Sequence, residues 1–508
     1  MEEKDKRERC GKGQKGPGVR VGRCEESETS NNDIKKILLQ LECHFTWTLR
    51  KENVDPDELE QRILDQIEFL PYESKVQNYN LLGFVKYLNG KKEDALDDLK
   101  KAEEAVKTEH PEDIEKHSLV TWGNYAWLFY HMGNMAEAQT YINKTEILCK
   151  RNKSTSPYKM KLPHIYCEKA WALLKFGANN HQRAKESFVK ALEEEPNNPE
   201  FNAGYAIAMY RLEDHDDRKS AAQSSSLEPL RRAVQLNPDD PCVLPLLALK
   251  LQETDNAEEG EKYMEESLAK HPDLPHVLRY AAKFYRKKGE VQTALKYLTK
   301  ALRLTPNSGF LHHQVGLCYR AMYFDMKKTR GFHHQPTEEM KELLRLCILH
   351  FQTVIEHKTK FFFAHLDLAN IYAEGGKIQE AEEMFQRAFG MKKLTNPEKQ
   401  WLHFCYGRYQ QFHKKSDSEA MKHFLEGLKI EHESSYREKC KDMLKKLIEK
   451  RIKKGPADAK SLGILGFIHQ LDGEKRQAIE CYERALKMDP GNEEYLSAIS
   501  NLRLSLQN

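Results

Sequence analysis

Residues 275–306 read PHVLRYAAKFYRKKGEVQTALKYLTKALRLTP, and this stretch decides the fold. It places Gly289, Ala294, Leu298, Ala301 and Pro306 at successive steps of 5, 4, 3 and 5 residues. The steps of 3 and 4 put the small and apolar residues on one face of a helix. The stretch therefore predicts a helix–turn–helix unit whose second helix packs closely against the first.

The same spacing recurs along the chain. All four steps are repeated by Gly473, Ala478, Tyr482, Ala485 and Pro490. The first three steps are repeated by Gly376, Ala381, Phe385 and Ala388, and again by Gly90, Ala95, Leu99 and Ala102. This is the spacing of a tetratricopeptide unit, whose period is about 34 residues. The sequence therefore predicts an all-α solenoid, a fold whose extended concave face usually binds a partner.

Repeat units can be placed along most of the chain. They fall at roughly 78–110, 119–150, 165–196, 202–238, 242–272, 275–306, 309–356, 362–390, 402–430 and 459–490. Two insertions are expected to be loops, a polar one from Glu213 to Ser226 and a basic one from about Met326 to Thr337. We expect the segment 31–75 to cap or fold over the first repeat, and the basic segment 431–458 to be helical.

Four regions follow from this organisation. They are a basic tail over 1–32, an N-terminal repeat region over 33–270, central repeats over 271–335 and a C-terminal repeat region over 336–508. The tail is charged, rich in glycine and poor in aliphatic residues, which predicts disorder. Its stretch Gly11–Gly16 matches GxGxxG, but no strand precedes it, so a basic flexible arm is favoured over a dinucleotide site.

Composition bounds the function only loosely. The chain has 81 Lys and Arg against 78 Asp and Glu, and this net charge of +3 neither requires nor excludes a polyanionic partner. The 11 cysteines are scattered and form no metal-binding spacing, which indicates reduced cysteines rather than a disulfide or zinc framework. No signal peptide or membrane-spanning run is visible, so we expect a cytoplasmic protein without membrane contact.

The motifs of common enzyme classes are missing from the sequence. It contains no GxxxxGK[ST], no HExxH and no GxSxG. The pairs His312-His313 and His333-His334 could suggest a metal site, but adjacent residues point to different sides of a helix. The sequence therefore favours a binding protein over an enzyme.

The first helix of a tetratricopeptide unit lines the concave side, and its positions 2, 5, 9 and 12 point inward. In the repeat 275–306 these positions hold His276, Arg279, Lys283 and Arg286, which form one nitrogen-bearing stripe. In the next repeat they hold Phe310, His313, Leu317 and Arg320. Cations follow phosphates and aromatic rings stack on bases, so the stripe suits single-stranded nucleic acid. A basic groove for an acidic peptide fits the same residues.

One common peptide-binding mode can be compared directly. Chaperone-tail clamps use Lys and Asn at positions 5 and 9 of their first repeat. Here the first clear repeat offers Asn80 and Phe84, and Asn124 falls at a clamp-like position in the next repeat. A single asparagine does not make a clamp, so this mode remains a minor alternative.

Four longer stretches carry a family resemblance. They are Leu41–Trp47, Ser118–Trp127, Arg279–Arg286 and Leu311–Tyr319. They closely resemble the interferon-induced proteins with tetratricopeptide repeats, and the resemblance extends from about Ile34 to Leu506. Within that family, Gly473–Ala478 and Leu502–Ser505 look most like the fifth human member, although the tail before Ile34 is longer than the family usually shows.

The resemblance implies a non-enzymatic innate antiviral effector that holds single-stranded RNA by its 5′-triphosphate end in a narrow, positively charged tunnel. Other family members or innate-signalling proteins are implied as partners. The family's triphosphate-contacting positions fall on Glu58, Arg62, Gln66, Lys175, His181 and Arg211. Glu58 opposes phosphate unless a divalent cation lies between them, which implies a bridging Mg²⁺.

The resemblance also implies a path for the RNA strand. Its positions fall on His276, Arg279, Tyr280, Lys283, Arg286, Phe310, His313 and Gln314, with Lys439 and Lys450 guiding RNA at the tunnel mouth. In cap-binding members an apolar pocket holds the methylated guanine, and it matches Leu70, Trp171 and Ile207 here; Trp171 fits the repeat core equally well. Three departures stand out: His181 and His276 replace family tyrosines, and Tyr72 replaces a smaller threonine near the pocket. Triphosphate capture is therefore favoured over cap binding.

Overall fold

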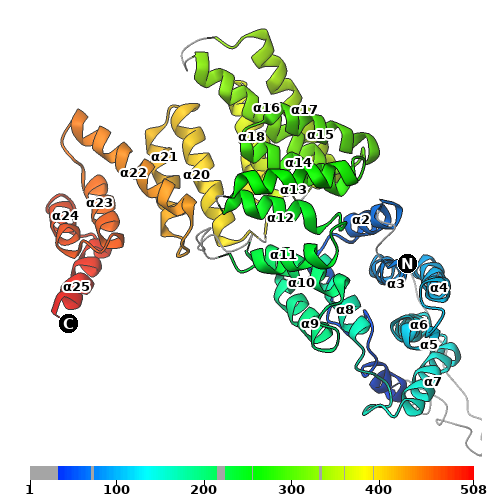
Figure 1. The fold of residues 1–508 in the computed structure, drawn as a ribbon. Helices are drawn as coiled ribbons and strands as arrows, with labels where there is room; N and C mark the ends of the chain where they lie inside the picture. Colours follow the sequence, from blue (N-terminus) through cyan, green and yellow to red (C-terminus); the bar gives the residue numbers. More distant parts are fainter. Residues whose placement is uncertain are drawn as a thin grey trace, which may run out of the picture. The chain divides into compact units, whose positions relative to one another are not determined.

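The computed structural model describes residues 32–69, 74–213, 224–254, 256–330, 335–359, 361–392 and 394–507, and the regular elements in these ranges are helices (Figure 1). The predicted tail, its Gly11–Gly16 stretch, Leu70 and Tyr72 lie outside the described residues. The chain divides into two compact units between Leu246 and Leu247. Unit 1 ends at Leu246 and unit 2 begins at Leu247.

Unit 1 is a series of helical hairpins preceded by an N-terminal segment. Its helices are α2 (Pro56–Phe69), α3 (Lys75–Leu88), α4 (Lys92–Glu109), α5 (Ile114–His117), α6 (Leu119–Met132), α7 (Met135–Arg151), α8 (Pro163–Lys175), α9 (His181–Glu194), α10 (Pro199–Glu213) and α11 (Leu227–Leu236). Short 3-10 turns, η1 (Lys51–Asn53) and η2 (Ala178–Asn180), precede α2 and α9. The predicted repeats over 78–110, 119–150, 165–196 and 202–238 are the hairpins α3–α4, α6–α7, α8–α9 and α10–α11.

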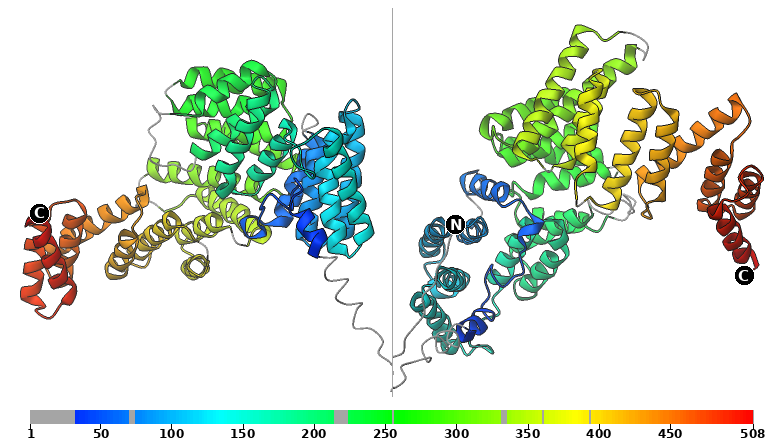
Figure 2. Two further views of the ribbon diagram at one scale, coloured as in Figure 1. Left: turned by 90° about the horizontal axis from the view of Figure 1, so that it is seen from below. Right: turned by 180° about the vertical axis from the view of Figure 1, so that it is seen from behind.

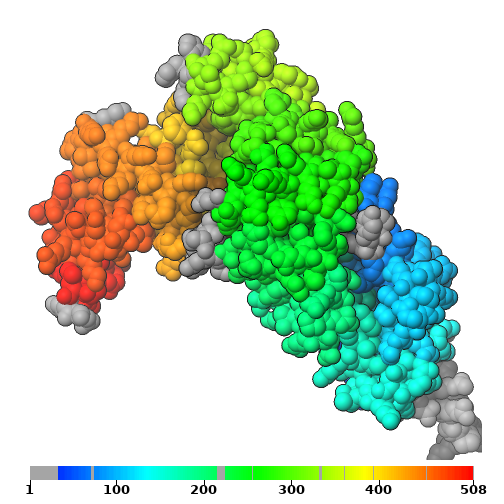
Figure 3. Space-filling model, viewed as in Figure 1, coloured from blue at the N-terminus to red at the C-terminus, as the bar shows by residue number. Residues whose placement is uncertain are grey.

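Unit 2 continues the pattern and ends on an additional helix. Its helices are α12 (Val243–Glu253, which spans the division), α13 (Ala257–Lys270), α14 (Pro275–Lys288), α15 (Val291–Leu304), α16 (Gly309–Arg330), α17 (Glu338–His357), α18 (Phe362–Glu374), α19 (Ile378–Phe389), α20 (Asn396–Phe412), α21 (Asp417–Lys429), α22 (Ser435–Lys454), α23 (Ala459–Leu471), α24 (Lys475–Met488) and α25 (Glu493–Gln507). Figure 2 shows these hairpins from two further sides, and Figure 3 shows one face of the same chain in a space-filling view coloured along the sequence. The predicted tetratricopeptide architecture is confirmed.

The residues that revealed the repeat do the packing. Gly289 ends α14 with φ 90°, a left-handed conformation that favours glycine and turns the chain into α15. Ala294, Leu298 and Ala301 are then buried against α14. In the next hairpin a Cβ on Gly316 would lie 2.4 Å from the Phe351 ring, so this close approach of α16 and α17 requires a glycine. The α14–α15 hairpin is thus closed by a turn glycine, and the α16–α17 hairpin by a small residue facing a large one.

The N-terminal segment is attached to the first two hairpins. Lys51 Nζ donates to the carbonyl of Leu88 at the end of α3 over 2.6 Å. The indole nitrogen of Trp127 on α6 donates to the carbonyl of Leu38 over 3.0 Å. The Lys91 ammonium also pairs with Glu60 of α2 at 3.1 Å. These contacts fix α2, which carries the first of the predicted phosphate-binding residues.

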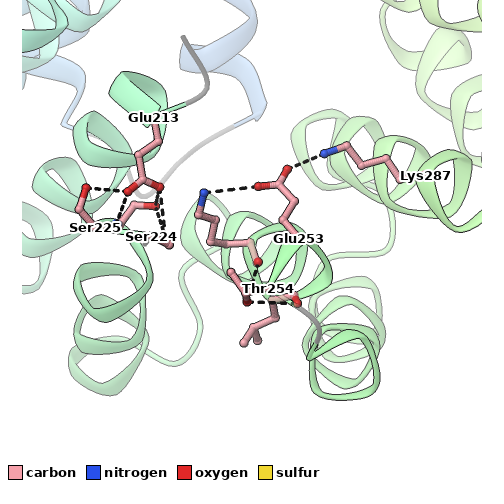
Figure 4. Close-up of polar contacts among 9 residues, drawn as sticks. Glu213, Ser224, Ser225, Glu253, Thr254 and Lys287 are labelled. Atoms are coloured by element: carbon pink, nitrogen blue, oxygen red, sulfur yellow. Dashed lines mark hydrogen bonds and ion pairs between the residues drawn. The ribbon is translucent and has the colours of Figure 1, made fainter. Parts of the chain in front are cut away.

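The two segments predicted to be loops each begin within a helix. The prediction of a loop from Met326 to Thr337 is wrong at its start, because α16 runs on to Arg330 and buries Tyr323 in its extension. The other insertion begins with Glu213, the last residue of α10. Its carboxylate accepts hydrogen bonds from Ser224 and Ser225 (Figure 4). These bonds hold the end of α10 next to the residues that precede α11. The residues between them lie outside the described ranges.

Three further sequence predictions concern the cysteines, membrane crossing and the basic segment 431–458. The nine cysteines of the described ranges are free thiols and seven are buried, as expected for reduced core cysteines. In the described part of the chain, no helix combines the length and apolarity needed to cross a membrane. The basic segment 431–458 is helical as predicted, because α22 occupies most of it.

Candidate nucleic-acid interface

Two arginines of unit 1 converge on the C-terminal end of α8. The guanidinium of Arg62, from α2, donates to the carbonyl of Lys175 over 3.3 Å. The guanidinium of Arg211, from α10, donates to the carbonyl of Leu174 over 3.1 Å. The last carbonyls of a helix carry partial negative charge and lack intrahelical partners, so they hold cations well. The C-terminal end of α8 thus binds two positive side chains, Arg62 and Arg211, that are 149 positions apart along the chain.

Lys175 adds a third cation at the same helix end. Its ammonium donates to the side-chain oxygen of Asn78, on α3, over 2.8 Å. These three bonds to Asn78, Leu174 and Lys175 all go to neutral oxygens. We call Arg62, Lys175 and Arg211 the α8-end cluster. A guanidinium can bind phosphate through two parallel hydrogen bonds, so the cluster is suited to a polyphosphate.

Glu58 and Gln66 share a face of α2 with Arg62, because they stand four residues before and after it. The acidic neighbours of Glu58 are turned to the next hairpin: Asn89 donates to Asp57 and to Glu60 over 3.0 and 3.2 Å. In the described ranges no group of three or more His, Cys, Asp or Glu side chains could hold a metal ion. The Mg²⁺ ion that the family resemblance implies beside Glu58 would therefore take its other ligands from phosphate and water, which is a common magnesium arrangement.

The remaining predicted residues of unit 1 are more enclosed. His181 is the first residue of α9 and is buried. Ile207 is buried on α10, and the half-buried Trp171 ring meets Phe188 edge-on at 5.3 Å. Packing within the α8–α9 hairpin therefore accounts for Trp171, and the third residue of the predicted cap pocket, Leu70, lies outside the described residues.

A buried carboxyl lies two turns before Lys175 on α8. Glu168 accepts a hydrogen bond from the Asn80 amide over 2.9 Å. Burial, and next the charge of Glu200, raise the pKa of Glu168 to about 8, although the bond from Asn80 opposes the shift. The carboxyl is therefore largely protonated at neutral pH and adds little negative charge near the α8-end cluster.

The clamp-like residues are part of the core. Asn80 and Asn124 are fully buried, and Asn124 bonds the backbone amide of His44 over 3.2 Å. Phe84 is buried as well, and its ring packs against Phe45 at 5.0 Å. None of the three can contact a docked peptide without unpacking the hairpin. This arrangement argues against the chaperone-clamp alternative.

In unit 2 the predicted stripe is organised by contacts between α14 and α16. The Arg279 guanidinium lies 5.0 Å from the Tyr280 ring and 5.1 Å from the Phe310 ring, at distances typical of cation–π contacts. It also approaches Nδ1 of His276 at 3.3 Å. Rings and cation therefore lie together, as stacking of bases and neutralisation of phosphates require.

The next turn of the stripe pairs Arg286 with Gln314. The guanidinium donates to the amide oxygen of Gln314 over 3.3 Å. Burial, and also the nearby Arg320 guanidinium, lower the pKa of Arg286. A bound anion beside Arg286 would oppose this shift. Lys283 is half-buried one turn before Arg286 on the same helix.

His313 is more enclosed than the stripe prediction implies. Only 7% of it is exposed, and its Nε2 contacts Asp367 of α18 at 2.9 Å. Arg320 pairs with the same carboxylate. The neighbouring His312 faces elsewhere, with its Nδ1 at 2.9 Å from Nδ1 of His350. The expectation that adjacent histidines point to different sides is confirmed for this pair, and His333 and His334 lie outside the described residues.

The two lysines predicted at the tunnel mouth lie on α22. Lys439 is exposed and its ammonium lies 4.4 Å from the Tyr436 ring. Lys450 is exposed and pairs with Asp417 at 3.2 Å. They contact neither each other nor the stripe on α14 and α16 among the described contacts, and they belong to a separate basic surface.

These features define the class of protein: a tetratricopeptide-repeat protein whose first helices carry cations and aromatic rings. Tetratricopeptide-repeat family models match residues 169–217, 281–310, 364–393 and 459–492. The chain belongs to the interferon-induced proteins with tetratricopeptide repeats. It is 47% identical to the human antiviral innate immune response effector IFIT1, over 90% of this chain and 96% of that protein. It is 41% identical to human interferon-induced protein with tetratricopeptide repeats 2, over 91% and 97%.

Solved structures agree with this assignment. The human IFIT1 dimer with PPP-AAAA is similar with a TM-score of 0.80 and 47% identity, over 90% of this chain and 99% of that one. The human IFIT1 dimer with m7Gppp-AAAA is similar with a TM-score of 0.82 and 46% identity, over the same shares. The finer resemblance to the fifth human member stays a prediction.

Sequence reasoning missed several residues that organise the interface. Asn78, Glu168 and Asp367 position or surround predicted residues, and their partners are 97, 88 and 54 positions away along the chain. No local signal identifies such pairs.

Proposed function

We propose that this protein is an antiviral RNA-binding protein that captures single-stranded RNA by its 5′-triphosphate end and sequesters it. The observation that carries the proposal is the α8-end cluster, in which Arg62, Lys175 and Arg211 meet at one helix end. The human relative IFIT1 was solved with PPP-AAAA and with m7Gppp-AAAA, which supports recognition of the 5′ end.

The two units contribute different chemistry to RNA binding. The α8-end cluster provides charge and forked hydrogen bonds for phosphate, whereas the stripe of unit 2 provides cations and rings for a strand. Neither phosphate contacts nor stacking read base edges, so binding is largely independent of base sequence. The closed, positively charged tunnel remains a prediction, as do a capped-RNA activity through Trp171 and Ile207 and a cytoplasmic, non-enzymatic role.

Mg²⁺ has a limited place in the proposal. Glu58 is the one predicted ligand on α2, and the ion would lie between its carboxylate and the phosphates. The residues of the chain do the binding: Arg62 and Gln66 would donate to phosphate oxygens from the same face of α2. We therefore expect Mg²⁺ to increase affinity for triphosphate RNA without being required for the fold.

A contact with a second family member is also proposed. Leu496 and Leu504 lie two turns apart on α25, and 49% and 61% of them are exposed. A terminal repeat normally has a polar outer face, so these leucines indicate a covered surface. Human IFIT1 was solved as a dimer, and its monomeric form carries two leucine-to-glutamate substitutions. A scaffold for acidic peptide or signalling partners is the competing role.

Titration of matched RNAs tests the proposal. One RNA sequence is prepared with a 5′ triphosphate, monophosphate, hydroxyl or cap, and each form is titrated with and without Mg²⁺. We expect the triphosphate form to bind at least tenfold more tightly than the hydroxyl form. Lys175→Ala and Arg211→Ala should remove that preference, whereas Lys107→Ala, at an exposed lysine on α4, should keep it. Equal affinity for all four ends, or undiminished preference in both variants, would refute end recognition.

A further inference from the structure

The register of the stripe continues onto α20. A Cβ on Gly407 would lie 2.6 Å from the Phe424 ring, the same relation that Gly316 has to Phe351. Counting from these two glycines, Trp401, Phe404 and Arg408 occupy the positions on α20 that Phe310, His313 and Leu317 occupy on α16. The face of unit 2 that carries the predicted RNA contacts on α16 therefore carries aromatic rings and a cation on α20.

Tyr436 of α22 stacks on this face. Its ring is parallel to Trp401 within 10°, with the centroids 4.9 Å apart. The Trp401 ring in turn lies 5.3 Å from Phe363 of α18. All three rings are half-buried, so each keeps an accessible part. The result is a ladder of rings across α18, α20 and α22.

Cations accompany the ladder. Lys439 Nζ lies 4.4 Å from the Tyr436 ring, and the Arg408 guanidinium lies 6.0 Å from Phe404 and 5.6 Å from Phe412. The helix α22 has nine basic residues against three acidic ones. Within the described ranges Lys439, Lys445 and Lys446 form no ion pair, although other basic residues of α22 do. The surface is thus positively charged without full internal compensation.

We propose that Trp401, Tyr436, Arg408 and Lys439 form a second RNA-binding surface, which stacks the bases of single-stranded RNA downstream of its captured 5′ end. The inference rests on the proposed function. Alternating rings and cations match a strand that presents a flat base and a phosphate at every nucleotide. An acidic peptide presents charge but no regular series of flat rings, so it explains Arg408 and Lys439 but not the ladder.

RNAs of different length and base content test the surface. Triphosphate RNAs of 4 and 16 nucleotides are compared with a 16-mer whose sugars beyond the fourth nucleotide carry no bases. Stacking on an aromatic side chain strengthens binding by roughly tenfold per base. We expect the 16-mer to bind at least tenfold more tightly than the 4-mer, and the abasic 16-mer to lose most of that gain.

Variants then locate the effect. Tyr436→Leu and Trp401→Leu should remove the gain that bases provide, whereas Tyr436→Phe should keep it because the ring remains. Phe324→Leu, which removes an exposed ring of α16 outside this register, should leave the gain intact. Thermal unfolding by circular dichroism checks that each variant is folded, and Tyr436→Phe together with the abasic RNA still tests the surface if the leucine variants unfold.

The outcomes separate this inference from the proposed function. Preference of the 4-mer for a triphosphate over a hydroxyl end reports only on the α8-end cluster, and Tyr436→Leu should not change it. If that preference holds while the base-dependent gain is absent, or persists in both leucine variants, the second surface is refuted. The second surface would also be refuted if a polyglutamate peptide displaced the 16-mer to the affinity of the 4-mer while the normal and abasic 16-mers bound with equal affinity.

Discussion

Glu168 is the residue at which burial and charge conflict most directly. Its carboxyl is buried on α8 and is bonded by the Asn80 amide, while the other side-chain atom of Asn80, Oδ1, has no hydrogen-bond partner among the described residues. A protonated carboxyl could donate to that oxygen, whereas a carboxylate could not. Protonation of Glu168 would therefore give the Asn80 oxygen a hydrogen-bond donor and would avoid a buried charge.

The raised pKa of Glu168 predicts a specific dependence of stability on pH. The native pKa of about 8 lies above the usual value of 4.5, so between these pH values the native state holds a proton that the unfolded chain releases. Stability should therefore fall as pH rises through this window, by at most about 1.4 kcal/mol per pH unit. Glu168→Gln should remove this term, and urea unfolding between pH 6 and 9 measures it.

The comparison must be made as a difference between variant and wild type. Burial lowers the pKa of His44 to about 3 and that of His164 to about 4, and their unfolded forms take up protons below pH 6.5, so acid destabilises both proteins alike. The free energy of unfolding of Glu168→Gln, minus that of wild type, should grow from pH 6 to 8 and then level off. Parallel profiles would contradict the assignment.

At the scale of the elements, close helix approach sets the register of each hairpin. Gly316 and Gly407 each face a phenylalanine of the paired helix, at Cβ distances of 2.4 and 2.6 Å, and Gly204 of α10 faces Phe188 of the preceding hairpin at 2.2 Å. The turn glycines act differently: Gly289 has no atom within 4 Å of a Cβ and is needed only for its positive φ. The repeat thus uses glycine for two separate physical reasons.

This difference predicts that the Gly316→Ala and Gly289→Ala variants respond differently in stability to a second substitution at Phe351. Gly316→Ala should destabilise the protein by about 1–3 kcal/mol through overpacking against Phe351. Phe351→Leu in the same chain should recover part of that loss. Gly289→Ala should cost about 1–2 kcal/mol through backbone strain and should not respond to Phe351→Leu. Urea unfolding followed at 222 nm measures these four chains together with wild type and Phe351→Leu alone, and recovery in both backgrounds, relative to the cost of Phe351→Leu alone, would contradict the two-cause explanation.

The elements also show how far sequence reasoning extends. The spacing at 275–306 predicted α14 and α15 with their turn, because helix and turn preferences are local. Sequence reasoning failed at α16. The basic stretch from about Met326 was predicted to be a loop, but the helix continues through it to Arg330. There Lys327 pairs with Glu374 of α18, a contact that no local pattern announces. Tertiary packing overrode the local reading.

At the scale of the whole molecule, the proposed RNA contacts combine two sets of cations. They are Arg62, Lys175 and Arg211 in unit 1, and Arg279, Lys283 and Arg286 in unit 2. Each set would give RNA binding a strong dependence on salt. The near-zero net charge of the chain does not prevent this, because the placement of charges rather than their sum determines the local potential.

Salt dependence therefore measures how many of these cations a strand meets. For single strands the slope of log Kobs against log salt is about −0.7 per phosphate neutralised, so each cation that a strand meets should add about −0.7 to the slope. Arg279→Ala should reduce its magnitude by about 0.7 and weaken all 5′ ends equally. Titrations at several KCl concentrations measure both slopes. An unchanged slope would exclude Arg279 from the RNA path.

The exposed leucines of α25 predict the assembly of the protein. Leu496→Glu together with Leu504→Glu should shift the protein toward a monomer, because two carboxylates would have to be buried in the proposed contact. Sedimentation velocity measures the change, and Glu493→Gln is a control at the start of the same helix. Affinity of the 4-nucleotide triphosphate RNA should stay the same. A wild-type protein that is monomeric at high concentration would exclude the contact.

The sequence by itself determined the repeat, because helix periodicity, turn glycines and small residues act over a few positions. It also placed Arg279, Lys283 and Arg286 on one helix face, since that face follows from spacing alone. Only the tertiary structure decided that Arg62 and Arg211 meet at the end of α8. It also decided that Glu168 is buried and that Tyr436 stacks on Trp401. Each of these contacts joins helices far apart in the chain, and no local periodicity specifies which distant side chains will meet.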